Sequence, residues 1–140
     1  MLKKVAVVGA GFIGRSWAMV FARAGCEVSL YDAYPNALEH ALILLEQNLV
    51  DLESNNLIES AKVVKSRIRA VSTIEDAIVD AQWVQENALE QVKIKREIFG
   101  QLDKLLPTQT IIASSTSAIP CSEINSGMQG AARMLVAHPA

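Results

Sequence analysis

The sequence predicts an α/β domain built on a doubly wound parallel sheet. Short apolar runs alternate with longer amphipathic segments along the 140 residues, which is typical of repeated βαβ units. A glycine-rich segment directly follows the first apolar run. The hydrophobic content of 51% is enough for one domain with a sizeable core. We therefore expect parallel strands covered by helices on both faces.

The first half of the chain predicts three strands and two helices, of which the second is the longer. Apolar residues 5–8 form the first strand, and a helical stripe from Ile13 to Ala24 ends at Gly25, as at a helix C-terminus. Residues 27–31 form the second strand. Pro35 starts a long helix that the segment 54–56 breaks. The pattern of residues 57–69 fits either a helix or a loop. Residues 68–72 could form a short third strand.

The second half continues the alternation. Thr73 and Asp76 have the spacing of a capping box, with Asp in place of the usual Glu or Gln, so a short helix follows. A strand is expected at 82–86, and a helix at 89–105 that Pro107 ends. Residues 110–113 form the next strand, before a loop at 114–117. The last strand covers 134–137, and His138 lies just past it.

Composition and charge exclude several classes of protein. The formal charge is −2 and no basic block is present, so a nucleic acid partner is not expected. No apolar run reaches the length of roughly 18 residues that a membrane-spanning helix needs. Lys3 and Lys4 before apolar residues resemble the start of a signal peptide, but glycines soon interrupt the run, which favours a strand. Cys26 and Cys121 are far apart, which predicts free thiols, a cytoplasmic protein and no metal site.

Gly9, Gly11 and Gly14 fit the pattern GxGxxG between the first strand and the first helix. In that context the pattern is typical of a dinucleotide-binding Rossmann domain. The first glycine permits the tight turn, the second lets the pyrophosphate approach the backbone, and the third lets the helix pack on the strand. The helix N-terminus offers free N–H groups to the phosphates. The alternative is an ordinary strand-to-helix turn.

Asp32 ends the second strand and predicts NAD as the cofactor. Its carboxylate accepts hydrogen bonds from the adenosine ribose and repels the 2′-phosphate of NADP. Ala33 and Tyr34 follow, so no adjacent arginine is available for that phosphate. The alternative is an exposed acid at a strand end.

Three later segments resemble the 3-hydroxyacyl-CoA dehydrogenase family. Residues 84–99 resemble the segment after that family's fourth strand, and Ser-Ser-Thr-Ser at 114–117 resembles its Ser-Asn-Thr-Ser. Residues 137–139, Ala-His-Pro, resemble the segment with its catalytic histidine. Gly-Arg-Ser-Trp-Ala-Met at 14–19 is most similar to the branch of lambda-crystallin and L-gulonate 3-dehydrogenase.

The resemblance implies a role for individual residues. Phe12 and Ile13 would contact the pyrophosphate through their backbone N–H groups, and Glu90 and Lys95 match an acidic and basic pair near the cofactor. Ser117 matches the serine beside the nicotinamide and the substrate hydroxyl. His138 matches the general base, a role that suits a group titrating near neutral pH. Without the resemblance, these four polar residues would be loop or solvated side chains; so would Arg15, Arg23 and His40.

Two departures from the family pattern shape the expected function. The glutamate that the family places about a dozen residues after its histidine is absent, as are its last strands and the helical C-terminal domain that builds a homodimer. We therefore interpret residues 1–140 as an incomplete NAD-binding domain that binds NAD but turns substrate over poorly. Family positions that reach coenzyme A fall near Asn48 and near Asn55 and Asn56, and residues 39–59 contain no lysine or arginine.

This lack of positive charge favours a small free hydroxy acid, such as L-gulonate or a 3-hydroxybutyrate-like molecule, over a CoA thioester. The expected reaction is oxidation of the 3-hydroxyl to a ketone by hydride transfer to NAD. A 3-hydroxyacyl-CoA dehydrogenase is the first alternative. A non-catalytic NAD sensor or a structural, crystallin-like protein is an alternative of another class.

Overall fold

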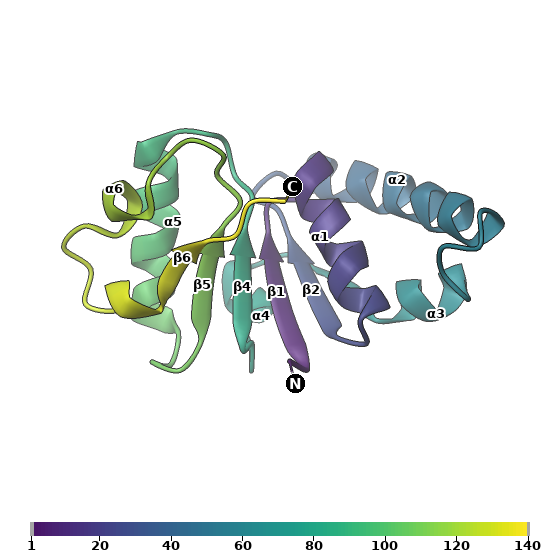
Figure 1. Cartoon of the computed structure of the whole chain (residues 1–140), viewed down its shortest axis with the longest axis horizontal. Coiled ribbons are helices and arrows are strands. Elements are labelled where there is room, and N and C mark those ends of the chain that lie inside the picture. Colours follow the sequence, from purple (N-terminus) through teal and green to yellow (C-terminus); the bar gives the residue numbers. More distant parts are fainter. Residues whose placement is uncertain (1, 140) are drawn as a thin grey trace.

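The computed structural model describes residues 2–139, which contain one parallel sheet with the strand order β3-β2-β1-β4-β5-β6 (Figure 1). This is the strand order of the Rossmann fold and confirms the predicted fold class. The strands are β1 (Lys4–Val8), β2 (Glu27–Tyr31), β3 (Ile68–Val71), β4 (Trp83–Glu86), β5 (Ile111–Ser114) and β6 (Met134–Val136). The helices are α1 (Phe12–Arg23), α2 (Pro35–Ser54), α3 (Ala61–Ser66), α4 (Ile74–Ala77), α5 (Val92–Leu105), α6 (Cys121–Asn125) and the 3₁₀ helix η1 (Ala131–Arg133).

Strand β1 lies at the centre of the fold and is buried on both faces. Val5 and Val7 belong to one hydrophobic cluster, whereas Ala6 and Val8 belong to the other. This division follows from the alternation of side chains along a strand, and it explains why β1 is a continuous apolar run.

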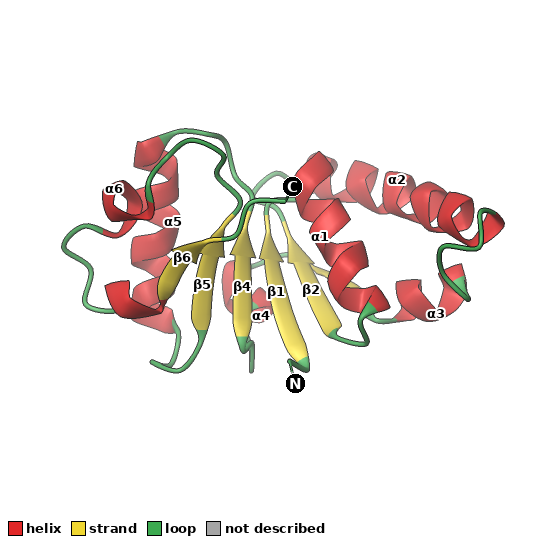
Figure 2. Cartoon of the chain, viewed as in Figure 1, coloured by secondary structure: helices red, strands yellow, loops and turns green. Residues whose placement is uncertain are grey.

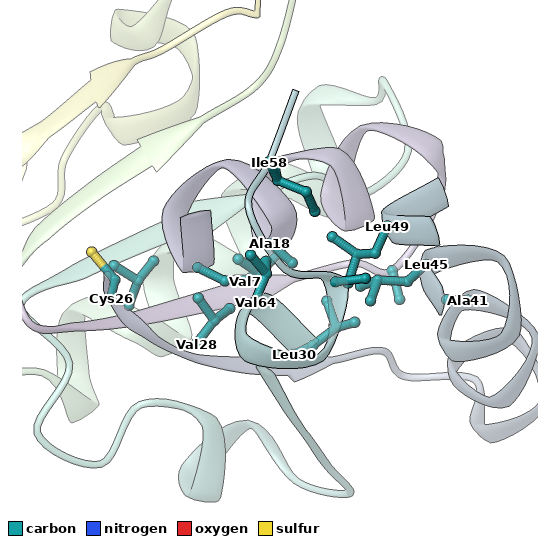
Figure 3. Packing of buried hydrophobic residues seen from close by; sticks show 14 residues of the cluster. Val7, Ala18, Cys26, Val28, Leu30, Ala41, Leu45, Leu49, Ile58 and Val64 are labelled. Atoms are coloured by element: carbon teal, nitrogen blue, oxygen red, sulfur yellow. The ribbon is translucent and has the colours of Figure 1, made fainter. Parts of the chain in front are cut away.

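Helices α1, α2 and α3 cover one face of the sheet (Figure 3). Ala18 and Ala22 of α1 are fully buried, and their small side chains let the helix approach the sheet closely. Leu45 and Leu49 carry the apolar stripe of α2 into the same cluster, so the predicted leucine stripe is part of the core. Helices α4, α5 and α6 cover the opposite face, with Phe99 and Leu102 among its buried residues.

The strand order reverses between β1 and β4, the two neighbours at the middle of the sheet. All strands are parallel, so their carboxyl ends meet along one edge, where Figure 2 shows the loops gathered above the arrowheads. Ligands of open α/β sheets bind at such a switch point, outside the carboxyl ends of the strands.

Most predicted elements are confirmed to within a residue or two, and the differences have local causes. The helix expected at 89–105 begins at Val92, because Leu89 and Glu90 belong to the preceding loop. The ambiguous region contains α3, which Ser60 caps by accepting a hydrogen bond from the N–H of Val63. The short helices α6 and η1 were not expected. Thr73 caps α4 through the N–H of Asp76, as the capping box predicts.

Candidate cofactor and active site

The three glycines of the GxGxxG segment, two between β1 and α1 and one in the first turn of α1, meet three different constraints. Gly9 has a φ of 92°, and a Cβ there would lie 2.9 Å from the backbone of Asn87. A Cβ on Gly14 would lie 1.8 Å from the carbonyl oxygen of Gly9. At Gly11 a Cβ would meet no atom within 4 Å. The open side of Gly11 therefore leaves room for a ligand to approach the backbone, as a pyrophosphate requires.

The N-terminus of α1 is open at the same place. Gly11 is its N-cap residue and provides no side-chain hydrogen bond, while Phe12 and Ile13, the first residues of the helix, are exposed. Free N–H groups and the helix dipole favour an anion at this position.

Asp32 directly follows β2 and is part of the turn itself. Its carboxylate accepts hydrogen bonds from the N–H of Ala10 (2.7 Å) and from the N–H of Tyr34 (2.9 Å). Each carboxylate oxygen has a second lone pair, so the group can still accept hydrogen bonds from a ribose. The structure therefore places a negative charge beside the glycine loop, where the sequence predicts it.

A cleft of about 560 Å³ extends from the glycine loop and Asp32 along the start of α2. Its volume and its largely apolar walls suit part of a dinucleotide. The apolar walls include Leu89, Ile94 and Ile98.

Arg15 lines this cleft and is half-buried, which corrects the expectation that it is a solvated helix residue; His40 also lines the cleft but is exposed, as expected. The guanidinium carbon of Arg15 lies 5.4 Å from the centre of the Phe12 ring, and its buried Nε atom has no hydrogen-bond partner among residues 2–139. The signal in the sequence is the position of Arg15 directly after the third glycine, in the first turns of α1. Arg23, at the other end of α1, is exposed as expected.

Lys95 is only 1% exposed, so it is not a solvated helix charge. Its ammonium group donates to both carboxylate oxygens of Glu86 (3.0 and 3.2 Å) and to the carbonyl of Ala88, and it lies 3.6 Å from Glu90. Glu86 also accepts hydrogen bonds from the hydroxyl of Ser114 and the N–H of Ala88. This buried ion pair joins α5 to β4 and β5, and a direct contact of Lys95 with the cofactor stays a prediction.

Glu90 lies in the loop before α5 and holds the loop that contains Ser117. Its carboxylate accepts hydrogen bonds from the hydroxyl of Thr116 and from the N–H groups of Ser117 (3.1 Å) and Ala118 (3.3 Å). Burial raises the pKa of Glu90, but these hydrogen bonds and the charge of Lys95 outweigh burial and bring the pKa below its ordinary value. Glu90 is therefore ionised at neutral pH and fixes the Ser117 backbone.

Ser117 and His138 follow the carboxyl ends of the adjacent strands β5 and β6, and both side chains are exposed. Figure 1 shows the segment after β6 passing over the ends of β5 and β4 toward the start of α1. The N–H of Ala137 donates to the carbonyl of Ser114 (2.9 Å), which continues the pairing of β6 with β5 up to His138. The structure thus brings both residues to the edge where the glycine loop lies.

Sequence reasoning missed a polar cluster beneath this edge, formed by Trp17, Gln85, Asn87 and Ser115. The available signal was Gln85, a polar residue in a strand expected to be buried.

The two cysteines are free, as expected, and burial raises the pKa of both thiols. No helix between residues 2 and 139 is long and apolar enough to cross a membrane. The same residues hold no cluster of metal ligands.

The strand order, the glycine loop and Asp32 define a dinucleotide-binding domain of the Rossmann class. The model of the family described as "3-hydroxyacyl-CoA dehydrogenase, NAD binding domain" matches residues 4–140. The chain belongs to this family, and NAD is its cofactor.

Relatives and solved structures agree with this assignment. The chain is 39% identical over 138 residues to the lambda-crystallin homolog of Bos taurus, a match that covers 96% of the chain and 43% of that protein. It is 37% identical to the L-carnitine dehydrogenase of Streptomyces griseus, with 99% of the chain and 41% of that protein covered. The 3-hydroxybutyryl-CoA dehydrogenase of Escherichia coli K12 superimposes with a TM-score of 0.91 at 29% identity, over 99% of the chain and 29% of that chain. The chain spans less than half the length of these relatives.

Proposed function

We propose that the chain is the cofactor-binding part of a dehydrogenase that oxidises the 3-hydroxyl of a small hydroxy acid to a ketone. The observation that carries this proposal is the placement of Ser117 and His138 at the ends of adjacent strands, on the edge of the sheet that also holds the glycine loop. A binding domain without chemistry has no need of a serine and a histidine at these positions.

The chemistry divides between the cofactor and two side chains. Bound NAD supplies the hydride acceptor. His138 accepts the proton of the substrate hydroxyl, and its exposed position lets it reach that group. Ser117 orients the same hydroxyl. Glu90 fixes the backbone of Ser117, so the serine is held in place before the substrate arrives.

The cleft supports a preference for NAD over NADP. Asp32 is fixed by two backbone N–H groups and cannot turn away from a 2′-phosphate without losing them. Arg15 lies in the same cleft at the start of α1, where its charge would favour the phosphates of either cofactor. Discrimination between the two therefore rests on Asp32.

We favour a free hydroxy acid of the L-gulonate or 3-hydroxybutyrate kind as the substrate. Residues 39–59, which include most of α2, contain no lysine or arginine that a coenzyme A phosphate could use. Lys65 of α3 is paired with Glu46. Lambda-crystallin homologs and L-carnitine dehydrogenases are among the relatives, which supports this choice. The likeness to a 3-hydroxybutyryl-CoA dehydrogenase supports a CoA thioester as the second candidate.

The test uses the protein as it occurs in nature. Turnover of NAD is measured with gulonate, with 3-hydroxybutyrate and with 3-hydroxybutyryl-CoA, and activity on the thioester alone would reverse the order of the two candidates. The substitution His138→Ala should lower kcat by on the order of 10²- to 10⁴-fold while the Kd of NADH stays within about twofold. Unchanged turnover in this variant would favour the alternative of a non-catalytic NAD sensor or structural protein. A homodimer and a cytoplasmic location stay predictions.

A further inference from the structure

Gln85 is a fully buried polar residue in the middle strand β4, and the proposed chemistry does not use it. Its side-chain oxygen accepts a hydrogen bond from the indole N–H of Trp83 (2.9 Å). Its side-chain amide donates to the hydroxyl of Ser115 (2.7 Å) and to the carbonyl of Ala137 (3.2 Å). All the polar atoms of this amide group are therefore bonded within the protein.

The contact between Gln85 and Ala137 joins elements that are not neighbours in the sheet. Strand β5 lies between β4 and β6, and the residue of β5 in register with Gln85 is Ala113. A small side chain at that register position leaves room for the amide of Gln85 to reach across β5. Ala137 directly precedes His138, so Gln85 fixes the peptide group from which the histidine begins.

The same cluster extends to the cofactor loop. The hydroxyl of Ser115 accepts a hydrogen bond from the indole N–H of Trp17 in α1 (3.0 Å) and donates to the side-chain oxygen of Asn87 (2.6 Å). The amide of Asn87 donates to the carbonyl of Val8, the residue before Gly9 (3.3 Å). A continuous chain of hydrogen bonds therefore runs from the glycine loop through Asn87, Ser115 and Gln85 to Ala137.

We propose that Gln85 is a positioning residue that fixes His138 relative to the cofactor loop. A buried polar network in which every group is bonded is rigid, because breaking one bond leaves an unsatisfied polar atom in the interior. Rigidity matters here because proton transfer and hydride transfer need the histidine and the cofactor at a fixed separation. The segment before His138 is also held by the hydrogen bond that the N–H of Ala137 donates to the carbonyl of Ser114. This inference rests on the proposed role of His138.

The test compares variants of the natural protein in steady-state kinetics and NADH titration. Gln85→Met keeps the length of the side chain but removes both donors, and Gln85→Asn keeps the amide but is too short by one methylene to reach Ala137. Trp83→Phe is the matched control, because it removes the partly buried hydrogen bond to the side-chain oxygen of Gln85 and leaves both donor contacts of Gln85. Both Gln85 variants should lower kcat on the order of 10- to 100-fold, with the Kd of NADH within about twofold of wild type. Trp83→Phe should stay within about threefold in both quantities.

A second readout separates positioning from stability. In the Gln85 variants the pH dependence of kcat should shift, because the surroundings of His138 change, and 15N relaxation should show greater mobility at the backbone amides of Ala137 and His138. The inference is wrong if both Gln85 variants keep kcat within twofold of wild type, or if kcat and NADH affinity fall together with the melting temperature. It fails separately from the proposed function: if His138→Ala abolishes turnover and the Gln85 variants do not lower it, only the role of Gln85 is wrong. If wild-type protein has no dehydrogenase activity, or His138→Ala retains it, the proposed function itself fails.

Discussion

Asp32 shows at the scale of one residue how the fold prepares the site. Its carboxylate binds the N–H of Ala10 in the glycine loop and the N–H of Tyr34 before α2, so it stabilises the turn in the absence of any ligand. A site that is already ordered loses less conformational entropy on binding. The residue that is predicted to select NAD is therefore also one that shapes the glycine loop.

Gly14 and Gly11 offer a matched pair of substitutions with opposite expected results. Gly14→Ala should destabilise the protein by about 3 kcal/mol or more, because a Cβ placed 1.8 Å from the Gly9 carbonyl forces the backbone to move. Urea unfolding measures this loss. Wild-type stability in Gly14→Ala would contradict the close contact of α1 with the loop.

Gly11→Ala serves as the control for the same motif. No atom lies within 4 Å of the added Cβ, and the φ of −62° suits alanine, so stability should change by no more than about 0.5 kcal/mol. NADH affinity should fall on the order of tenfold or more, since the methyl group occupies the side from which the pyrophosphate approaches. Fluorescence titration with NADH measures this effect.

At the scale of elements, the loop after β5 is held by a charge from the loop before α5. Glu90→Gln should cost about 1 kcal/mol at neutral pH, a value reduced because the side chain is 45% exposed. The folded-state pKa lies below the unfolded value of about 4.3, so the contribution is complete above that value and is lost as the pH falls through the folded pKa. The difference between the melting temperatures of wild type and variant should thus be smaller at pH 3 than at pH 7. An equal difference at both pH values would contradict the role of the ionised carboxylate.

The elements also show what local sequence can and cannot predict. Strand β1 was predictable because its continuous apolar run marks a strand buried on both faces, and strand β2 because Val28 and Leu30 alternate with more exposed residues. The glycine loop and Asp32 were predictable because they form a local motif. The burial of Lys95 was not predictable, because Lys95 pairs with Glu86, which is nine positions away. Glu86 in turn accepts a hydrogen bond from the hydroxyl of Ser114. The contact of Gln85 with Ala137 spans 52 positions, and periodicity carries no information about such a pair. The short helices α6 and η1 have too few residues to show a helical period.

At the scale of the whole molecule, the reversal of strand order brings the two parts of the site together. The loop after β1 and the end of β2 form the cofactor cleft, whereas the ends of β5 and β6 carry Ser117 and His138. The side chain of Asn87, after β4, joins the two through Val8 and Ser115. In this topology β4 pairs with β1, so the site depends on the order in which the strands are connected as well as on the residues that form it.

This arrangement predicts that cofactor binding and turnover can be separated. The cofactor cleft is lined within residues 2–139, but the ring of His138 is exposed and has no hydrogen-bond partner there to orient it or to stabilise its protonated form. A polypeptide of residues 1–140 should therefore bind NADH, with the Gly11→Ala variant binding at least about tenfold more weakly. Its kcat with a hydroxy acid should be at least on the order of 10²-fold below that of a full-length relative, because an unoriented base loses most of its advantage. NADH titration and stopped-flow absorbance at the nicotinamide band measure the two quantities on one sample. Turnover equal to that of a full-length relative would mean that residues 1–140 already hold His138 in its productive orientation.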